Sequence, residues 1–250
     1  MNILIFGGTT EGRELSRLLR EAGASVTVSV ATAYGGEEQG RVHGVQTRTG
    51  PMSEAEKAEL LKNTELCVDA THPYAAHVSA SVKAACESAG VEYLRLLRPP
   101  CDTGDAVIVE SAADAAAWLK AREGRVMLTT GSKNLSDYRE LEPERLIPRV
   151  LPNREAIAAC EALGIPHRNI IAMQGPFSRE LNAALMRQYD VRFVVSKDGG
   201  GPGGFPEKRE AAIECGARLI VIRRPEERGL SFDEVLNLCI ARLRDANMKE

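Results

Sequence analysis

The sequence predicts an α/β fold built from two Rossmann-like, doubly wound parallel-sheet domains. Short β-branched runs alternate with helical patterns along the whole chain, which is typical of a parallel sheet. A proline-rich break interrupts the alternation at residues 98–104, and a glycine-rich turn follows the first strand. Domains of this kind bind ligands at the carboxyl ends of their strands. We therefore expect the active site in the cleft between the two domains.

The first half of the chain ends at the proline-rich break. Strands are expected at 2–6, 25–31, 45–48, 65–69 and 92–97, and helices at 11–22, 53–63 and 74–89. Pro99 and Pro100 exclude both a helix and a central strand at the break. We therefore expect a dinucleotide-binding domain at residues 1–100.

The second half repeats the alternation. Strands are expected at 106–109, 125–130, 146–150, 169–172, 191–196 and 218–222, and helices at 111–121, 153–162, 178–188, 207–215 and 231–245. Residues 101–250 are therefore expected to form a second α/β domain that contributes to substrate binding.

The composition is that of a globular protein and excludes several classes. The 250 residues carry a net charge of −3, with no basic field that would favour nucleic acid. The apolar runs are far shorter than the ~18 residues that span a bilayer, and the first residues are typical of a strand and not of a signal peptide. Six cysteines and four histidines lack metal-ligand spacing. We expect a soluble cytoplasmic monomer or small homo-oligomer without a metal or a membrane partner.

Residues 7–12 form a glycine-rich turn that opens the first helix. A dinucleotide pyrophosphate rests at such a position on backbone N–H groups and the positive helix end. Against the G-x-G-x-x-G pattern, Gly7 and Gly12 match and Thr9 replaces the second glycine. The expected cofactor-binding residues are Gly7, Gly8, Thr9, Thr10, Glu11 and Gly12. The alternative is an ordinary turn in which Thr9 or Thr10 caps the helix and Glu11 faces its dipole.

The second strand is followed by no acidic residue before Glu37. An acid at that point would bind the ribose 2′-hydroxyl of NAD. Ser29, Thr32 and Arg41 are instead expected to receive a 2′-phosphate, which favours NADPH. The alternative is a loop that binds nothing.

The segment Asp69-Ala70-Thr71-His72-Pro73-Tyr74 lies at the carboxyl end of the fourth strand. Pro73 suits the first turn of the following helix, so His72 is expected to point into the crevice. There it would contact the cofactor or donate to a substrate carboxylate, with Thr71, Pro73 and Tyr74 as further cofactor-binding residues. The alternative is that His72 is only a turn or cap residue.

Residues 197–208 follow a buried strand and are rich in glycine. They favour a mobile loop that closes over an anion, with Lys197 and Lys208 as cations. Lys197 and Asp198 emerge directly from the strand and, with His72, are the expected catalytic residues. The alternatives are a flexible connector, or an Asp198 that only caps the turn.

Two more strand ends in this half, at 129–133 and 174–179, carry hydroxyl and basic side chains. The full set of expected substrate-binding residues is Gly131, Ser132, Lys133, Arg179, Lys197, Gly203, Gly204 and Lys208.

These motifs make the chain resemble the precorrin-6A reductase family of cobalamin biosynthesis, which includes cobalt-precorrin-6A reductases. The resemblance covers nearly the whole chain. It is carried, in order, by Gly7-Gly8-Thr9 with Glu11, Asp69–Ala75, Thr130–Lys133, Gln174–Ser178, Lys197-Asp198, Gly203-Gly204 with Lys208, and Arg224-Pro225. One departure is Gly199, because serine commonly follows the Lys-Asp pair in the family, and a hydroxyl role at that position is lost.

The resemblance implies reduction of one ring double bond of a contracted tetrapyrrole, with hydride supplied by NADPH. The acetate and propionate groups of such a substrate would accept charge-assisted hydrogen bonds from Lys133, Arg179, Lys197 and Lys208. Two other functions stay open at this point. One is a two-domain tetrapyrrole lyase or cyclase without nicotinamide, and the other is a non-catalytic NADP-binding sensor.

Overall fold

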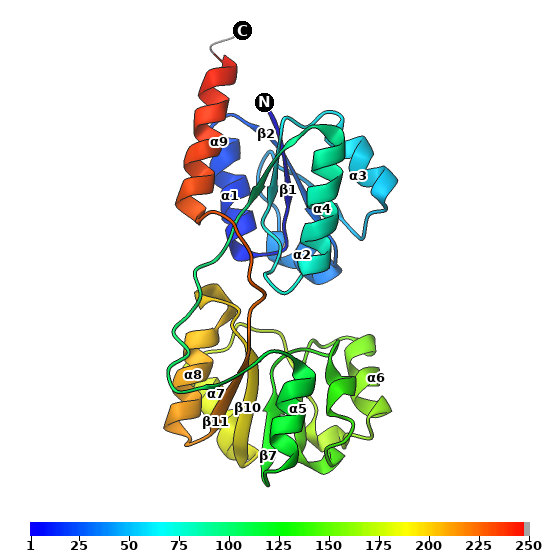
Figure 1. Ribbon diagram of the computed structural model, residues 1–250, viewed down its shortest axis with the longest axis vertical. Coiled ribbons are helices and arrows are strands. Elements are labelled where there is room, and N and C mark those ends of the chain that lie inside the picture. The colour runs from blue at the N-terminus through cyan, green and yellow to red at the C-terminus, as the bar shows by residue number, and fades with distance from the viewer. Residues whose placement is uncertain (248–250) are drawn as a thin grey trace. The chain divides into compact units, whose positions relative to one another are not determined.

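The computed structural model describes residues 1–247, apart from the side chains at positions 34, 38, 202 and 247. It divides into two compact units, each with its own parallel sheet (Figure 1). The first unit contains Met1–Pro99 and the chain from Pro225 onward, and the second contains Pro100–Arg224. The expected α/β class with two parallel sheets is confirmed.

The first unit is a five-stranded sheet in the order β3-β2-β1-β4-β5. Its elements are β1 (Asn2–Phe6), α1 (Thr10–Glu21), β2 (Ser25–Val30), α2 (Ala33–Gln39), β3 (Gln46–Thr49), α3 (Glu54–Leu61), β4 (Leu66–Asp69), α4 (Ala76–Ala89), β5 (Glu92–Arg95) and α9 (Phe232–Asn247). All its paired strands are parallel, so their carboxyl ends share one edge of the sheet.

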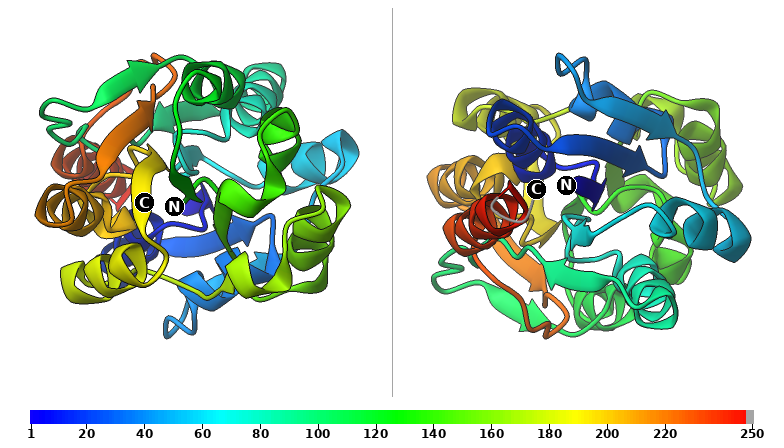
Figure 2. Two further views of the ribbon diagram at one scale, coloured as in Figure 1. Left: turned by 90° about the horizontal axis from the view of Figure 1, so that it is seen from below. Right: turned by 90° about the horizontal axis from the view of Figure 1, so that it is seen from above.

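Alternating side chains bury both faces of this sheet. Ile3 and Ile5 of β1 pack into a core shared with α1 and α9. Leu4 and Phe6 point to the opposite face and pack with side chains of α3 and α4. Figure 2 shows these helix pairs on opposite sides of the sheet.

The expected assignment of residues 101–250 to one domain is wrong at its C-terminal end. The chain from Pro225 onward returns to the first unit, where Leu230 bridges to Leu96 beside β5. The apolar face of α9, formed by Val235, Cys239 and Leu243, is buried in the core beside α1. Burial of this face explains the return. The first passage of the chain between the two units falls between Pro99 and Pro100.

Helix α2 lies where the sequence indicated a loop. Thr32 caps it by accepting from the Gly35 N–H at 3.0 Å. Two glycines inside a helix weaken it, but here the helix packs against the β1–α1 turn, because Gly35 approaches the Cα of Gly8 closely. Tertiary contact therefore outweighs low helix propensity at this position.

The second unit is a six-stranded sheet in the order β6-β11-β10-β7-β8-β9, also parallel. Its elements are β6 (Val107–Val109), α5 (Ala112–Lys120), β7 (Arg125–Leu128), η1 (Leu135–Tyr138), η2 (Pro143–Arg145), β8 (Leu146–Val150), α6 (Arg154–Ala162), η3 (His167–Asn169), β9 (Ile171–Ala172), α7 (Arg179–Gln188), β10 (Val191–Lys197), η4 (Gly201–Gly203), α8 (Phe205–Glu214) and β11 (Arg218–Ile222).

Helices cover both faces of the second sheet. Met186 of α7 and Phe205 of α8 share one buried core with Val194 of β10. Helices α5 and α6 lie on the other side (Figure 1). None of the helices within residues 1–247 combines the length and apolar character needed to cross a bilayer.

Candidate functional site

The β1–α1 turn brings backbone N–H groups to the carboxyl edge of the first sheet. Gly7 donates its N–H to the Ser29 carbonyl at 2.8 Å. Gly8 has a φ of 104°, which L side chains rarely adopt. A Cβ at Gly12 would lie 3.2 Å from the Ala70 Cβ, so glycine lets α1 start beside the end of β4. The first N–H groups of α1 have no acceptor within the helix and give this end a positive potential.

The Thr9 hydroxyl is used inside the protein. Its Oγ1 accepts from the Gly12 N–H at 3.1 Å and donates to the Ala70 carbonyl at 2.8 Å. Thr9 is therefore the N-cap of α1, which is the capping alternative considered from the sequence. Thr10, the first residue of α1, is exposed.

Glu11 forms an ion pair inside the first unit. Its carboxylate lies 2.7 Å from the Arg98 guanidinium, and both side chains are largely shielded from solvent. The position in the first turn of α1 also suits a negative charge. The pair therefore fixes the chain after β5 to the start of α1.

The end of β2 only partly matches the expected 2′-phosphate site. Ser29 is buried, and its Oγ lies 3.9 Å from the Met52 Sδ. This side chain faces the protein interior, so the structure does not support Ser29 as a phosphate ligand. Thr32 is exposed at the start of α2.

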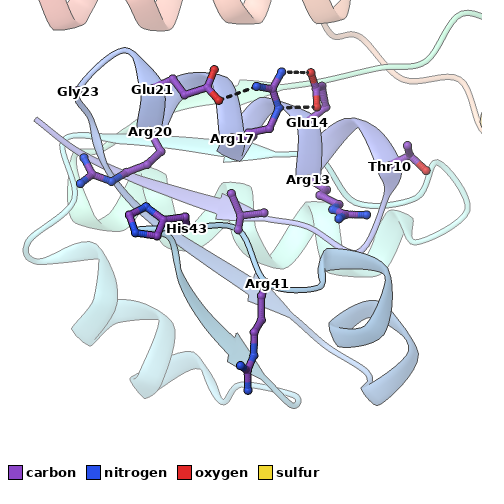
Figure 3. Close-up of a pocket in the computed structure, with 10 residues that line it drawn as sticks. Thr10, Arg13, Glu14, Arg17, Arg20, Glu21, Gly23, Arg41 and His43 are labelled. Atoms are coloured by element: carbon purple, nitrogen blue, oxygen red, sulfur yellow. Dashed lines mark hydrogen bonds and ion pairs between the residues drawn. The ribbon is translucent and has the colours of Figure 1, made fainter.

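A pocket of about 730 Å³ runs along α1, from Thr10 at the start of the helix to Gly23 just after its end, and residues 41–43 also line it (Figure 3). Most of the residues that line it are charged. The full lining is Thr10, Arg13, Glu14, Arg17, Arg20, Glu21, Gly23, Arg41, Val42 and His43. Arg17 is neutralised by Glu14 and Glu21, each at 2.6 Å. The pocket therefore has an excess of positive charge.

The side chains of Arg13 and Arg41 point in different directions (Figure 3). The Arg13 guanidinium lies beside Gly40, the residue that ends α2. Arg41 lines the pocket, but its side chain points away from α1 in Figure 3. Sequence reasoning missed Arg13, although its place directly after the third glycine of the turn was a usable signal.

The end of β4 carries a buried hydrogen-bond network. Asp69, at 0% exposure, accepts from the Tyr93 hydroxyl at 2.8 Å and from the Thr71 hydroxyl at 2.7 Å. The Arg95 Nη1 lies 3.2 Å from the Asp69 carboxylate. Burial, followed by the charge of Asp69, raises the pKa of Tyr93, so this hydroxyl remains a donor. Sequence reasoning did not identify Arg95 or Tyr93.

His72 and its neighbours form a turn. The Ala75 N–H donates to the His72 carbonyl at 2.8 Å, and Pro73 takes the position that prolines prefer in such turns. The helix begins only at Ala76, so the expected place of Pro73 in its first turn is wrong. His72 is exposed, and its ring lies 5.6 Å from that of Tyr74.

Two lysines converge at the carboxyl edge of the second sheet. Lys197 ends β10, and Lys133 follows the neighbouring strand β7 through Gly131 and Ser132. Lys197 is half-buried and Lys133 is exposed. Burial, and then the charge of Lys133, lower the pKa of Lys197. Two of the four expected cations, Lys133 and Lys197, are therefore together on one edge.

Asp198 is a buried acceptor. Its Oδ1 accepts from the Gly200 N–H at 3.0 Å, and its Oδ2 accepts from the Cys101 N–H at 3.1 Å. Arg224 lies 3.4 Å from the same carboxylate. Asp198 therefore caps the turn that follows β10, which is the alternative considered from the sequence. It also holds the backbone at Cys101, near the start of the second unit.

The expectation that residues 197–208 form a mobile loop is wrong for the last part of this segment, which is helical. Helix α8 starts at Phe205, and both Phe205 and Lys208 are buried on its inner face. Lys208 donates to the Ser196 hydroxyl at 2.9 Å. Burial lowers its pKa to about 7. Lys208 is therefore an internal group and not a surface cation on a mobile loop.

The remaining expected substrate-binding residues are more scattered. Arg179 is exposed at the start of α7 and pairs with Glu180 and Glu214, so its charge is already balanced. Gly203 is exposed in η4 and Gly204 is buried at the start of α8.

Sequence reasoning missed Arg149, which lies buried near the end of β8. It donates to the Asn182 Oδ1 at 2.7 Å and lies 4.0 Å from the centre of the Phe177 ring. Burial lowers its pKa to about 10. Within residues 1–247, no group of three or more histidine, cysteine or carboxylate side chains is placed to hold a metal ion.

The chain is similar to known reductases along most of its length. A cobalt-precorrin-6A reductase of Methanothermobacter thermautotrophicus is 37% identical over 233 residues, 90% of this chain and 77% of that protein. One of Salmonella typhimurium is 38% identical over 231 residues, 90% and 88% of the two chains. A precorrin-6A reductase of Sinorhizobium sp. is 32% identical over 251 residues, 94% and 91% of the two chains.

A solved structure agrees with these relatives. CobK precorrin-6A reductase matches with a TM-score of 0.80 at 27% identity, covering 95% of each chain. The family model described as precorrin-6x reductase CbiJ/CobK matches residues 2–240. The glycine turn, the Asp69–Tyr74 segment and the paired lysines all lie within this range. The chain therefore belongs to the precorrin-6x reductase CbiJ/CobK family of oxidoreductases.

Proposed function

We propose that this chain reduces a ring double bond of precorrin-6A or cobalt-precorrin-6A to the 6B form in cobalamin biosynthesis, with NADPH as the reductant. Family membership supports the reaction. The β1–α1 turn is the observation that carries the cofactor assignment, because it is the part of the first unit suited to a dinucleotide pyrophosphate.

The residues of this turn fit NADPH. Gly8 places no side chain between the backbone and an approaching pyrophosphate, Gly12 lets α1 start beside the end of β4, and the start of α1 favours anions. Bound there, the cofactor supplies a hydride for the reduction. Thr9 and Glu11 support this arrangement indirectly, since their side chains hold α1 to the end of β4 and to Arg98.

Arg13 and Arg41 support a preference for NADPH over NADH. Both line the same pocket, and Thr32 is exposed at the end of the second strand. Arginine binds phosphate through charge-assisted hydrogen bonds. An acid that would repel a 2′-phosphate is absent between Ser29 and Gly36. The 2′-phosphate is therefore assigned to Arg13 and Thr32, with Arg41 as a second cation.

Lys133 and Lys197 are assigned to carboxylate groups of the tetrapyrrole. Their convergence at one sheet edge supports this role, and the lowered pKa of Lys197 indicates a site that gains from a bound anion. His72 is assigned to the cofactor or to a substrate carboxylate, because it is exposed beside the end of β4. The proton that completes the reduction comes from the site or from solvent.

Two measurements test this function. NADPH fluorescence is titrated with the purified protein, and saturable binding is expected. Turnover is then followed anaerobically with precorrin-6A and cobalt-precorrin-6A, and NADPH oxidation matched by formation of the 6B product is expected. No binding would favour the lyase, and binding without turnover of either substrate would favour the sensor.

A further inference from the structure

The Asp69 side chain holds the segment that carries His72. Asp69 Oδ1 accepts from both the N–H of Thr71, at 3.0 Å, and its hydroxyl, at 2.7 Å. The Tyr93 hydroxyl donates to Oδ2 at 2.8 Å. One fully buried carboxylate thus organises the first residues after β4.

Arg95 closes the same network from β5. Its Nη1 donates to the Thr71 carbonyl at 2.9 Å and to the Asp69 carbonyl at 3.1 Å. Its Nη2 donates to Glu227 at 2.8 Å. Both backbone polar groups of Thr71 are therefore fixed, one by Asp69 and the other by Arg95. The Thr71 hydroxyl also lies 3.2 Å from that of Ser79 in α4.

The fixed backbone leads directly to the imidazole of His72. The Tyr74 N–H donates to the His72 Nδ1 at 3.3 Å. A ring nitrogen that accepts a hydrogen bond carries no proton, so the neutral ring holds its proton on Nε2. Nε2–H is therefore the donor of the neutral His72 ring. Its direction depends on the turn that follows Thr71.

Stability alone does not explain so polar a network. A buried ion pair is often no better for folding than apolar residues of similar volume, but it can specify one conformation. We propose that Asp69 and Arg95 are positioning residues that set the orientation and the tautomer of His72. This inference deepens the proposed function, on which the catalytic or binding role of His72 rests.

The test reads His72 directly in the protein without ligand. The chain has four histidines, so ¹H–¹⁵N imidazole spectra are sparse, and His72→Gln assigns the signal. Near pH 8 the wild type is expected to show the Nε2–H tautomer at His72. In Asp69→Asn, the spectrum is expected to shift to the average of two tautomers, and NADPH-dependent kcat/KM is expected to fall.

Two further variants separate positioning from general destabilisation. Gln39→Ala removes another buried polar side chain of the first unit, one that donates to the Ser16 hydroxyl in α1, and it should leave the His72 tautomer unchanged. Tyr93→Phe keeps the ring volume and removes one donor to Asp69, so it provides the test if Asp69→Asn does not fold.

A folded Asp69→Asn or Tyr93→Phe protein with the wild-type His72 spectrum overturns the inference. A changed spectrum with unchanged turnover supports positioning and removes His72 from the proposed reaction. Because the spectra need neither NADPH nor substrate, failure of the positioning role is distinguishable from failure of the proposed function.

Discussion

The ammonium group of Lys208 lies 2.9 Å from the hydroxyl of Ser196, inside the second unit. Ser196 in turn donates to the Lys197 carbonyl at 3.0 Å, so a buried lysine supports the strand end that presents Lys197. The charged groups that act on Lys208 are Arg149, which lowers its pKa, and Glu207, which raises it. Burial is the largest cause, and the pKa falls to about 7 from 10.5.

The first prediction is that Lys208 makes stability depend on pH. Between pH 7 and 10.5 the unfolded chain binds a proton at Lys208 that the folded chain does not. The free energy of unfolding should therefore increase with pH in this window, by at most ~1.4 kcal/mol per pH unit. Lys208→Met should lose this contribution, as measured by urea unfolding at pH 7 and pH 9.5. Equal pH slopes in wild type and variant would contradict the burial of a titrating amine.

The second prediction concerns the buried carboxylate of Asp198. Asp198→Asn removes the charge beside Arg224 and weakens the acceptor for two N–H groups, so unfolding should become easier by about 2–4 kcal/mol. Asp102→Asn is the control, because that carboxylate is 80% exposed and should change stability by less than about 1 kcal/mol. A variant as stable as wild type, with kcat reduced ~10²-fold, would instead make Asp198 a general acid.

The third prediction separates Thr9 from direct cofactor contact. Thr9→Val removes the cap and the bond to the Ala70 carbonyl, and should cost about 1–2 kcal/mol of stability in urea unfolding. Thr9→Ser keeps the hydroxyl and should remain near wild type. If Thr9→Val is as stable as wild type but binds NADPH more weakly by ~1 kcal/mol of binding free energy, the hydroxyl contacts the cofactor.

The fourth prediction concerns cofactor choice. Arg13→Gln should raise the Kd for NADPH about tenfold or more, the scale of a lost charged hydrogen bond, and leave that for NADH nearly unchanged. Arg17→Gln is the matched control on the same helix, because Glu14 and Glu21 already bind that guanidinium. Fluorescence titrations with both nucleotides check this. Equal losses for NADPH and NADH in Arg13→Gln would remove the 2′-phosphate from this pocket.

Much of the fold could be predicted from the sequence because strands and turns have local signals. The expected strand at 146–150 coincides with β8, and the proline pair marks the passage between the units. The position of α9 had no such signal. The apolar face of Val235, Cys239 and Leu243 shows that the helix is covered, but not which sheet covers it.

The site was harder to predict because polar side chains have several uses at a strand end. Thr9 and Asp198 are caps, as considered, because short oxygen-bearing side chains satisfy nearby N–H groups. The burial of Lys208 could have been predicted, because Phe205, Lys208 and Ala211 are three residues apart and so lie on one face of a helix. The glycines before them indicated a loop and hid that spacing.

The most direct test of the proposed reaction follows the hydride itself. The enzyme is incubated anaerobically with cobalt-precorrin-6A or precorrin-6A and NADPH carrying deuterium at the transferred position of C4, and the product is analysed by mass spectrometry. The account predicts a 6B product that contains one deuterium on carbon, with one NADPH oxidised per product formed. Product formed without deuterium from either C4-labelled epimer of NADPH, or NADPH bound without reduction of either substrate, would contradict it.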